Sequence, residues 1–338
     1  MRHLAKYIIT RTLLTIPMVL ILLSIVFLVL RIMPGDPVSS MLGGHAPEKV
    51  IEQKKEELGL NEPMAVQYVS YLWQVAHLDL GESMVFKQRV TTAIADKLPA
   101  TIELTACGMI ITLILGVFLG AYAADRRRQV QDSMIRLYGI VIYCIPVYWL
   151  GLMLQLIFGI WLDVMPIAGR TGPRVFASTF EQTGFYLIDT LLIRDFAALK
   201  DVMIHLTLPA FTLGLTLSGI FIRLTRANML DVLKADYIIA AEARGIRHSR
   251  IVYRHALKNA FIPILTMMGL QVALLMAGAI LTETTFSWPG MGRLLLERIY
   301  LRDYPTIQGV IIVFALIVAG VSLVVDIIYA MIDPRIRY

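Results

Sequence analysis

Apolar residues gather along this chain into long blocks that alternate with shorter polar connections. A helix needs about 20 residues to cross the hydrocarbon core of a bilayer, and each block is about that long. The blocks therefore predict an all-α polytopic membrane protein with six transmembrane helices. The predicted spans are Ile8–Leu30, Ala100–Ala124, Leu137–Ile160, Ile204–Ile222, Phe261–Leu281 and Gly309–Met331.

The connections predict how the chain is organised. Residues 1–32 hold the N-terminus and the first span, which we interpret as a retained helix because its apolar run is too long for a signal peptide. Residues 33–98 are expected to form an external helical insertion. Residues 99–338 are expected to form the core with five spans, including a cytoplasmic loop at 223–262. The helices expected outside the spans are Pro47–Leu58, Met64–Leu78, Phe185–Leu199 and Gly292–Tyr300.

Composition supports a membrane protein, and the placement of charge predicts its orientation. Of the 338 residues, 57% are hydrophobic and only 17% are charged, which is more apolar than a soluble domain. More than half of the 31 Lys and Arg residues fall in connections that share one side when both termini are placed inside. Because basic residues collect on the cytoplasmic side, we expect both termini in the cytoplasm. The net charge of +6 is then a feature of orientation and not of nucleic-acid binding.

The chain lacks the motifs of a catalytic protein. No Gly-Lys dipeptide occurs, so a phosphate-binding loop of the GxxxxGK[ST] type is absent, and no HExxH pattern occurs. His248 and His255 lie on a predicted helix with no third candidate ligand. Cys107 and Cys144 fall inside predicted spans, where we interpret them as packing residues. We therefore predict no catalytic residue, no metal site and no cofactor site.

Two acidic residues leave a second class of transporter open. Asp326 lies toward the inner end of the sixth predicted span, and Glu103 lies at the outer start of the second. Ion-coupled carriers place such groups near the middle of the bilayer. We interpret both residues as caps or cross-links between helices, and an ion-coupled secondary carrier remains the alternative.

A charged island, Arg223–Lys258, separates two of the long apolar blocks. It holds eight Lys or Arg residues and three acidic ones. Its first part, Met229–Arg244, is helical in pattern, Gly245 permits a sharp change of direction, and a second helix is expected after Ser249. Two short helices that meet at a glycine would form a compact surface for a partner with an acidic face. The alternative is a basic loop held against anionic lipid.

At these residues the sequence resembles the permease subunits of ABC importers. Their general signature is Glu-Ala-Ala, three residues, Gly, nine residues and then Ile-x-Leu-Pro. Ala240-Ala241 and Gly245 match it, whereas Ile239 replaces the leading Glu, and His255 and Lys258 replace the Ile and the Pro. The match is closer to the branch that imports dipeptides, oligopeptides and nickel. The matching residues are Asp236-Tyr237, Ala241, Ala243, Gly245, His255-Ala256-Leu257, Asn259-Ala260 and Pro263.

The resemblance extends over nearly the whole chain as an ordered series of short motifs. In the first half these are Pro34-Gly35-Asp36-Pro37, Leu58-Gly59-Leu60, Asp79-Leu80-Gly81 and Leu98-Pro99-Ala100-Thr101. In the second half they are Glu283-Thr284-x-Phe286-Ser287-Trp288-Pro289-Gly290, Arg302-Asp303-Tyr304-Pro305 and Asp333-Pro334-Arg335-Ile336-Arg337-Tyr338. The long first external segment is similar to that of the first permease of the pair.

The resemblance implies a role and a set of partners. The chain would pair with a homologous permease in the inner membrane of a bacterium or archaeon and form half of a path for peptides. Two cytoplasmic ATPases would bind ATP and Mg²⁺, and an external substrate-binding protein would deliver the solute. Nickel chelates, glutathione or oligosaccharides are alternative substrates, and a membrane-embedded scaffold or receptor is a third class.

The resemblance also implies two sites. The ATPase-coupling loop would consist of Asp236, Tyr237, Ala240, Ala241, Glu242, Ala243, Arg244, Gly245, His255 and Asn259. The outer gate or the contact with the binding protein would consist of Glu283, Phe286, Trp288, Pro289 and Gly290.

Overall fold

The computed structural model describes residues 2–32, 38, 47–57, 59–173, 175 and 182–332, and within these it is helical with no named strand. Among these residues, five helices are long and apolar enough to cross a membrane. They are α1 (Arg2–Ile32), α5 (Val90–Asp125), α9 (Phe196–Val232), α12 (Leu257–Thr285), which continues from a π-helical turn at Ile251–Ala256, and α14 (Tyr304–Ile332). The prediction of an all-α polytopic membrane protein is confirmed.

The predicted third span, Leu137–Ile160, is not a straight helix. It divides into α6 (Val130–Cys144) and α7 (Val147–Leu154), the latter continued by a π-helical turn to Trp161, with a bend of 103° between them. Pro146 has no N–H to donate and disfavours a helical conformation at the residue before it. Ile145 is accordingly extended, with φ −78° and ψ 126°. With the bent pair counted as one span, the described residues provide six.

The core is built on the pair α5 and α9, whose contact is the most extensive in the described residues. Small residues permit the close approach, as is common between helices in membranes. A Cβ on Gly120 of α5 would lie 2.6 Å from the Cβ of Thr225. The Thr112 hydroxyl donates to the carbonyl oxygen of Gly214 at 3.1 Å. Helices α6, α7 and α12 pack against this pair.

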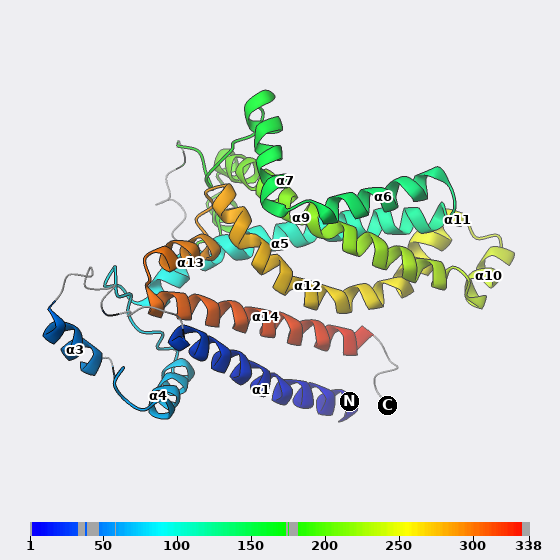
Figure 1. Cartoon of the computed structure of the whole chain (residues 1–338). Coiled ribbons are helices and arrows are strands. Elements are labelled where there is room, and N and C mark those ends of the chain that lie inside the picture. Colours follow the sequence, from blue (N-terminus) through cyan, green and yellow to red (C-terminus); the bar gives the residue numbers. More distant parts are fainter. Residues whose placement is uncertain are drawn as a thin grey trace.

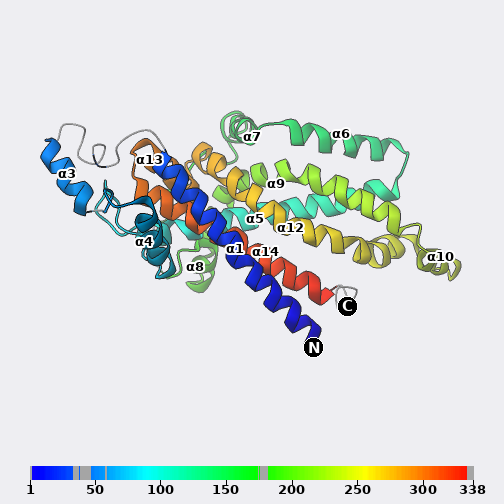
Figure 2. The same cartoon turned by 60° about the horizontal axis from the view of Figure 1, so that its bottom comes forward.

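The helices form a bundle with two distinct ends (Figure 1). One end carries α10 (Asp236–Ala243) and α11 (His248–Arg250), and we call it the α10 end. The other carries α3 (Glu48–Glu57), α4 (Met64–Ala76), α8 (Tyr186–Leu192) and α13 (Met291–Tyr300), and we call it the α13 end. Helix α1 packs on α14 at the edge of the bundle (Figure 2). Helix α1 begins and α14 ends toward the α10 end (Figure 1).

Three of the four predicted short helices are present. Helices α3, α4 and α13 match the predictions, although Leu58 lies outside the described residues. The predicted helix Phe185–Leu199 is wrong as a single element, because α8 ends at Leu192 and α9 begins at Phe196. Arg194 adopts φ +58° at the break. The Asp195 carboxylate then accepts from the N–H groups of Ala197 and Ala198, both at 3.0 Å, and caps α9.

The predicted helix Met229–Arg244 is also interrupted. Helix α9 ends at Val232, and α10 begins at Asp236 after an extended Ala235 with φ −71° and ψ 146°. The turn lets the chain fold back so that Ile238 reaches the hydrophobic cluster at the α10 end. The domain boundaries at residues 32 and 98 stay predictions. Of the motifs, Pro34–Pro37 and Asp333–Tyr338 lie outside the described residues.

Candidate coupling site and the opposite end of the bundle

Helix α10 is held on the bundle by a hydrophobic anchor. Ile238 is only 1% exposed and joins a buried cluster with Met229 of α9, Ile251 and Val252. Burial of a side chain of this size contributes about 1.5–3 kcal/mol. Ile251 and Val252 lead directly into α12. The cluster therefore links α10 to the start of α12 and, through Met229, to the end of α9.

The rest of α10 is open to solvent. Ala240, Glu242 and Ala243 are exposed, Ala241 is half-buried, and Ile239 is 57% exposed. Small side chains on an exposed helix face let the backbone of another protein approach closely. The face is therefore suited to a docking contact.

A glycine in a left-handed conformation ends α10. Gly245 has φ +71°, and its N–H donates to the carbonyl oxygen of Glu242 at 2.9 Å. The N–H of Ile246 donates back to the oxygen of Ala241 at 3.2 Å. This is the usual way for a helix to end at glycine, which has no Cβ to clash. The predicted sharp change of direction at Gly245 is confirmed.

Two of the predicted coupling residues from separate helices meet. The side-chain amide of Asn259 donates to the Tyr237 hydroxyl at 2.7 Å. Asp236 lies in the first turn of α10, where a negative charge is favourable because of the helix dipole. His255 is half-buried and Arg244 is exposed. The structure thus places all ten predicted residues at the α10 end.

Three residues at this end were missed by the sequence analysis. Asp132 of α6 accepts from Arg226 of α9 at 2.6 and 2.9 Å, a forked pairing of high geometric specificity. Asp125, at the end of α5, accepts from His248 of α11 at 2.6 Å. Both acids stand out in the sequence because they flank the cluster Arg126–Arg128. The first pair joins α6 to α9, and the second joins α5 to α11.

The second predicted site lies at the α13 end, and its main side chains are buried. Glu283 and Trp288 are fully buried and Phe286 is 1% exposed, while Thr284 and Ser287 are exposed. Pro289 is half-buried and Gly290 is buried. Thr284 and Ser287 are the exposed residues of the segment Glu283–Gly290. Its two predicted roles, as an outer gate or as the contact with the binding protein, stay predictions.

Glu283 serves as a cap for α13. Its carboxylate accepts from the Thr101 hydroxyl of α5 at 2.6 Å and from the Arg293 N–H at 3.0 Å. The Met291 N–H donates to the Thr101 oxygen at 2.8 Å. These bonds satisfy N–H groups that a helix N-terminus leaves open. The Trp288 indole N–H donates to the carbonyl oxygen of Ala100 at 3.0 Å. The motif thus locks α5, α12 and α13 together.

We expect Gly290→Ala to destabilise this lock. A Cβ on Gly290 would overlap the Glu283 carboxylate, so either α13 or Glu283 must move. Overpacking of a filled site costs about 1–3 kcal/mol. The expected result is a lower midpoint of thermal unfolding for the purified chain. Gly320→Ala is the matched control, because Gly320 lies in α14 with nothing within 4 Å of a new Cβ. Equal midpoints for both variants would contradict the assignment.

A buried ion pair adds a second lock at this end. Arg170 donates to Glu103 of α5 at 2.6 Å through Nη2 and at 3.2 Å through Nε. The other Glu103 oxygen accepts from the Leu187 N–H of α8 at 2.7 Å. The Arg170 guanidinium lies 3.6 Å from the centre of the Tyr186 ring. The interpretation of Glu103 as a cross-link between helices is confirmed.

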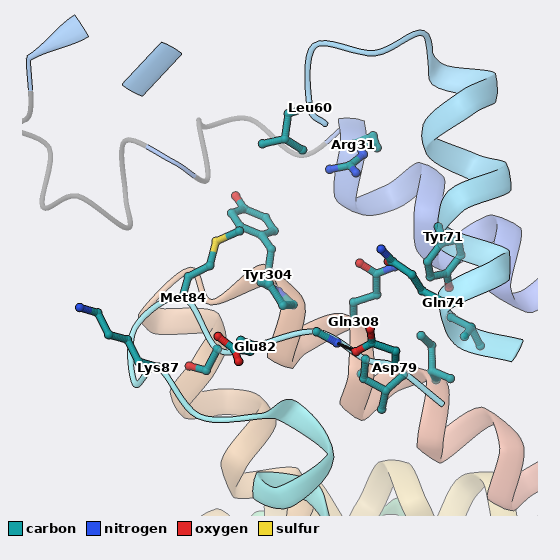
Figure 3. Close-up of a pocket in the computed structure, with 17 residues that line it drawn as sticks. Arg31, Leu60, Tyr71, Gln74, Asp79, Glu82, Met84, Lys87, Tyr304 and Gln308 are labelled. Atoms are coloured by element: carbon teal, nitrogen blue, oxygen red, sulfur yellow. Dashed lines mark hydrogen bonds between the residues drawn. The ribbon is translucent and has the colours of Figure 1, made fainter. Parts of the chain in front are cut away.

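A cavity of about 500 Å³ opens at the α13 end beside α4 (Figure 3). Figure 3 shows Met84 and Tyr304 on one side of it and Gln74, Asp79 and Gln308 on the other. Charged side chains of both signs line it, namely Arg31, Asp79, Glu82 and Lys87. Burial raises the pKa of the Tyr71 phenol in its wall, so this group stays neutral. The cavity holds none of the predicted site residues.

Asp303 fixes one wall of the cavity. The fully buried carboxylate accepts from the hydroxyls of Ser83 at 2.6 Å and Thr306 at 2.7 Å, and from the Met84 N–H at 3.1 Å. Two of the motifs quoted from the sequence, Asp79-Leu80-Gly81 and Arg302-Asp303-Tyr304-Pro305, meet at this cavity, because residues of both line it. Their separation of more than 200 residues hid this from the sequence analysis.

The described residues contain no group of three or more His, Cys, Asp or Glu side chains that could hold a metal ion. The α10 end presents an exposed helix on a buried anchor. At the α13 end the hydrogen bonds of Glu283, Thr101 and Trp288 form a buried network that we call the clasp.

Comparison with known proteins defines the class. Residues 116–338 match the family model of the binding-protein-dependent transport system inner membrane component. Residues 4–105 match the model of the N-terminal part of such membrane components. The chain belongs to this family of transport permeases, which are not themselves enzymes.

Relatives in the family cover nearly the whole chain. The dipeptide transport system permease protein DppB of Alkalihalophilus pseudofirmus is 41% identical over 332 residues, 98% of this chain and 99% of the relative. DppB of Escherichia coli K12 is 39% identical over 336 residues, with the same coverage. The glutathione transport system permease protein GsiC of Pectobacterium atrosepticum is 36% identical over 333 residues, again 98% and 99% of the two chains. The resemblance stated from the motifs is thus confirmed.

Proposed function

We propose that this chain is one of two permease subunits of an ATP-driven importer that carries short peptides. The relatives named for dipeptide transport match it over nearly their full length. In this proposal a homologous permease completes the pathway, two ATPase subunits bind ATP and Mg²⁺, and an external binding protein delivers the peptide. The α10 end faces the cytoplasm of a bacterial or archaeal inner membrane, consistent with its many basic residues.

The observation that carries the proposal is the position of α10. It is anchored through Ile238 on the turn that leads into α12, and its opposite face is exposed. Helix α12 has 29 residues, or a length of about 43 Å, and ends at Thr285 within the clasp around Glu283. One helix therefore connects the contact surface at one end with the clasp at the other.

This connection supports a mechanism of alternating access. When ATP closes the two ATPases, the two α10 surfaces of the permease pair are drawn together. Helices α9 and α12 move with α10 as rigid bodies and change the opening at the α13 end. The pathway itself needs little selectivity, because the binding protein chooses the solute.

Uptake by proteoliposomes tests the proposal. The full complex, with ATP inside the vesicles and loaded binding protein outside, is expected to accumulate a labelled dipeptide when the proton gradient has been collapsed. Omission of internal ATP is expected to abolish uptake. Uptake that needs the gradient and ignores ATP would instead establish an ion-coupled secondary carrier.

Glutathione is the second candidate substrate, because GsiC relatives match over 98% of the chain. Competition distinguishes the two substrates. Unlabelled dipeptide is expected to suppress uptake of the labelled dipeptide, whereas glutathione is not. The reverse result would assign the importer to glutathione, and suppression by nickel chelates or oligosaccharides would assign it to those solutes.

A further inference from the structure

Helix α4 has three sides of different character. One side packs on the protein through Tyr68, Tyr71, Leu72 and Val75. With about 3.6 residues per turn, the remaining surface divides into two sectors. The apolar sector is exposed and consists of Ala65, Val66, Val69, Trp73 and Ala76. The polar sector is exposed and consists of Ser70, Gln74 and His77.

The apolar sector is large for a surface in water. Val66 is 51% exposed, Val69 is 65% exposed and Trp73 is 69% exposed. Contiguous exposed apolar side chains on one helix face mark a contact with another apolar phase. A helix with separate apolar and polar faces that lies beside a transmembrane helix has the form of an interfacial membrane helix.

The depth of α4 along α1 can be read from its contacts. The Tyr68 hydroxyl pairs with the Ser24 hydroxyl at 2.6 Å, and the Tyr71 hydroxyl donates to the Leu23 carbonyl oxygen at 3.4 Å. Both partners lie inside the apolar stretch Thr12–Val29 of α1. Leu23 precedes the end of that stretch by six residues, or about 9 Å along the helix. Helix α4 therefore contacts α1 within the apolar stretch of this membrane-spanning helix and not beyond its end.

The surroundings of the two sectors agree with this depth. Helix α1 exposes Ile21 and Ile25 over the turns that contact α4, so apolar surface is present at the same depth. The polar sector borders the charged cavity through Gln74, which lines it together with Asp79. Apolar surface is thus present at the depth of α4, and the polar sector of α4 adjoins groups that need water.

We infer that α4 is a lipid-binding helix that lies in the membrane interface with its apolar sector embedded among acyl chains. Trp73 is its anchor, because the indole is enriched where membrane and water meet. The Trp73 ring contacts the His77 ring at a centroid distance of 4.4 Å, so an apolar and a polar side chain adjoin at the sector boundary. The inference depends on the contacts of α4 with α1 and not on the solute or energy source.

Spin-label accessibility tests the inference in the full complex reconstituted into nanodiscs of phosphatidylethanolamine and phosphatidylglycerol. Single cysteines replace Val69 or Trp73 in the apolar sector, and Ser70 or His77 in the polar sector, in a chain with Cys107→Ala and Cys144→Ala. Labels at 69 and 73 are expected to collide more with oxygen than with a water-soluble nickel chelate. Labels at 70 and 77 are expected to show the opposite order.

Two results would overturn the inference. Collision of all four labels mainly with the nickel chelate would mean that α4 stands in water. Protection of 69 and 73 from both reagents would mean that a protein, such as a partner subunit or the binding protein, covers the sector.

A second measurement avoids labels. Lipids with brominated acyl chains quench nearby tryptophan, and Trp73→Phe is expected to remove part of the quenchable emission. An unchanged quenched fraction in this variant would place Trp73 away from acyl chains and contradict the inference.

Discussion

Gly245→Pro is expected to abolish the stimulation of ATP hydrolysis by loaded binding protein while the chain still inserts and assembles. Proline fixes φ near −65°, whereas this position needs φ +71°, and it removes the N–H that donates to Glu242. The cost is about 3 kcal/mol or more, which lowers the population of the native loop about a hundredfold. ATPase assays of the reconstituted complex measure the effect.

Gly245→Asn is the matched control for the backbone. Asparagine tolerates the left-handed region better than other residues with a Cβ, and nothing lies within 4 Å of a new Cβ here. We expect this variant to keep most of its coupling. Full coupling in Gly245→Pro would remove α10 and its glycine stop from the transmission of energy.

Arg170→Met is expected to destabilise the chain by about 3–5 kcal/mol, because it leaves the Glu103 carboxylate buried without its partner. Arg170 is 6% exposed and Glu103 is 5% exposed, so water cannot compensate for the loss. Unfolding of the purified chain by titration with sodium dodecyl sulfate measures the free energy. A large decrease should be accompanied by poor assembly with partner subunits.

The double variant Glu103→Gln with Arg170→Met supplies the control. Removal of both charges is expected to recover much of the stability, which gives a coupling free energy from the double-mutant cycle. Additive losses would mean that the two side chains act independently and that the pair is not the lock at this end.

The sequence predicted those parts of the fold that depend on local pattern. The apolar blocks are long enough to define the spans. Gly245 indicates the end of α10 because glycine adopts a left-handed conformation readily. Pro146 indicated a break between α6 and α7. The sequence analysis predicted one continuous span because the apolar run extends on both sides of this proline. The break at Arg194 depends on a left-handed arginine, which no periodicity indicates.

The sites were predicted unequally. The coupling residues lie in one short segment, so local helix geometry nearly determines which of them lie close together. Glu283 is different, because its partner Thr101 is 182 positions away and the burial of both arises only when α5 and α12 pack. A motif that looks like an exposed turn in the sequence is for this reason a buried clasp in the fold.

Site-specific photo-crosslinking from α10 is the most direct test of the central claim that force reaches this chain through its α10 surface. A crosslinking amino acid at Ala240, which is exposed, is used in the complete complex in native membranes. The account predicts a crosslink to an ATPase subunit whose yield changes when ATP is bound. Crosslinks to lipid alone, with and without ATP, would contradict it.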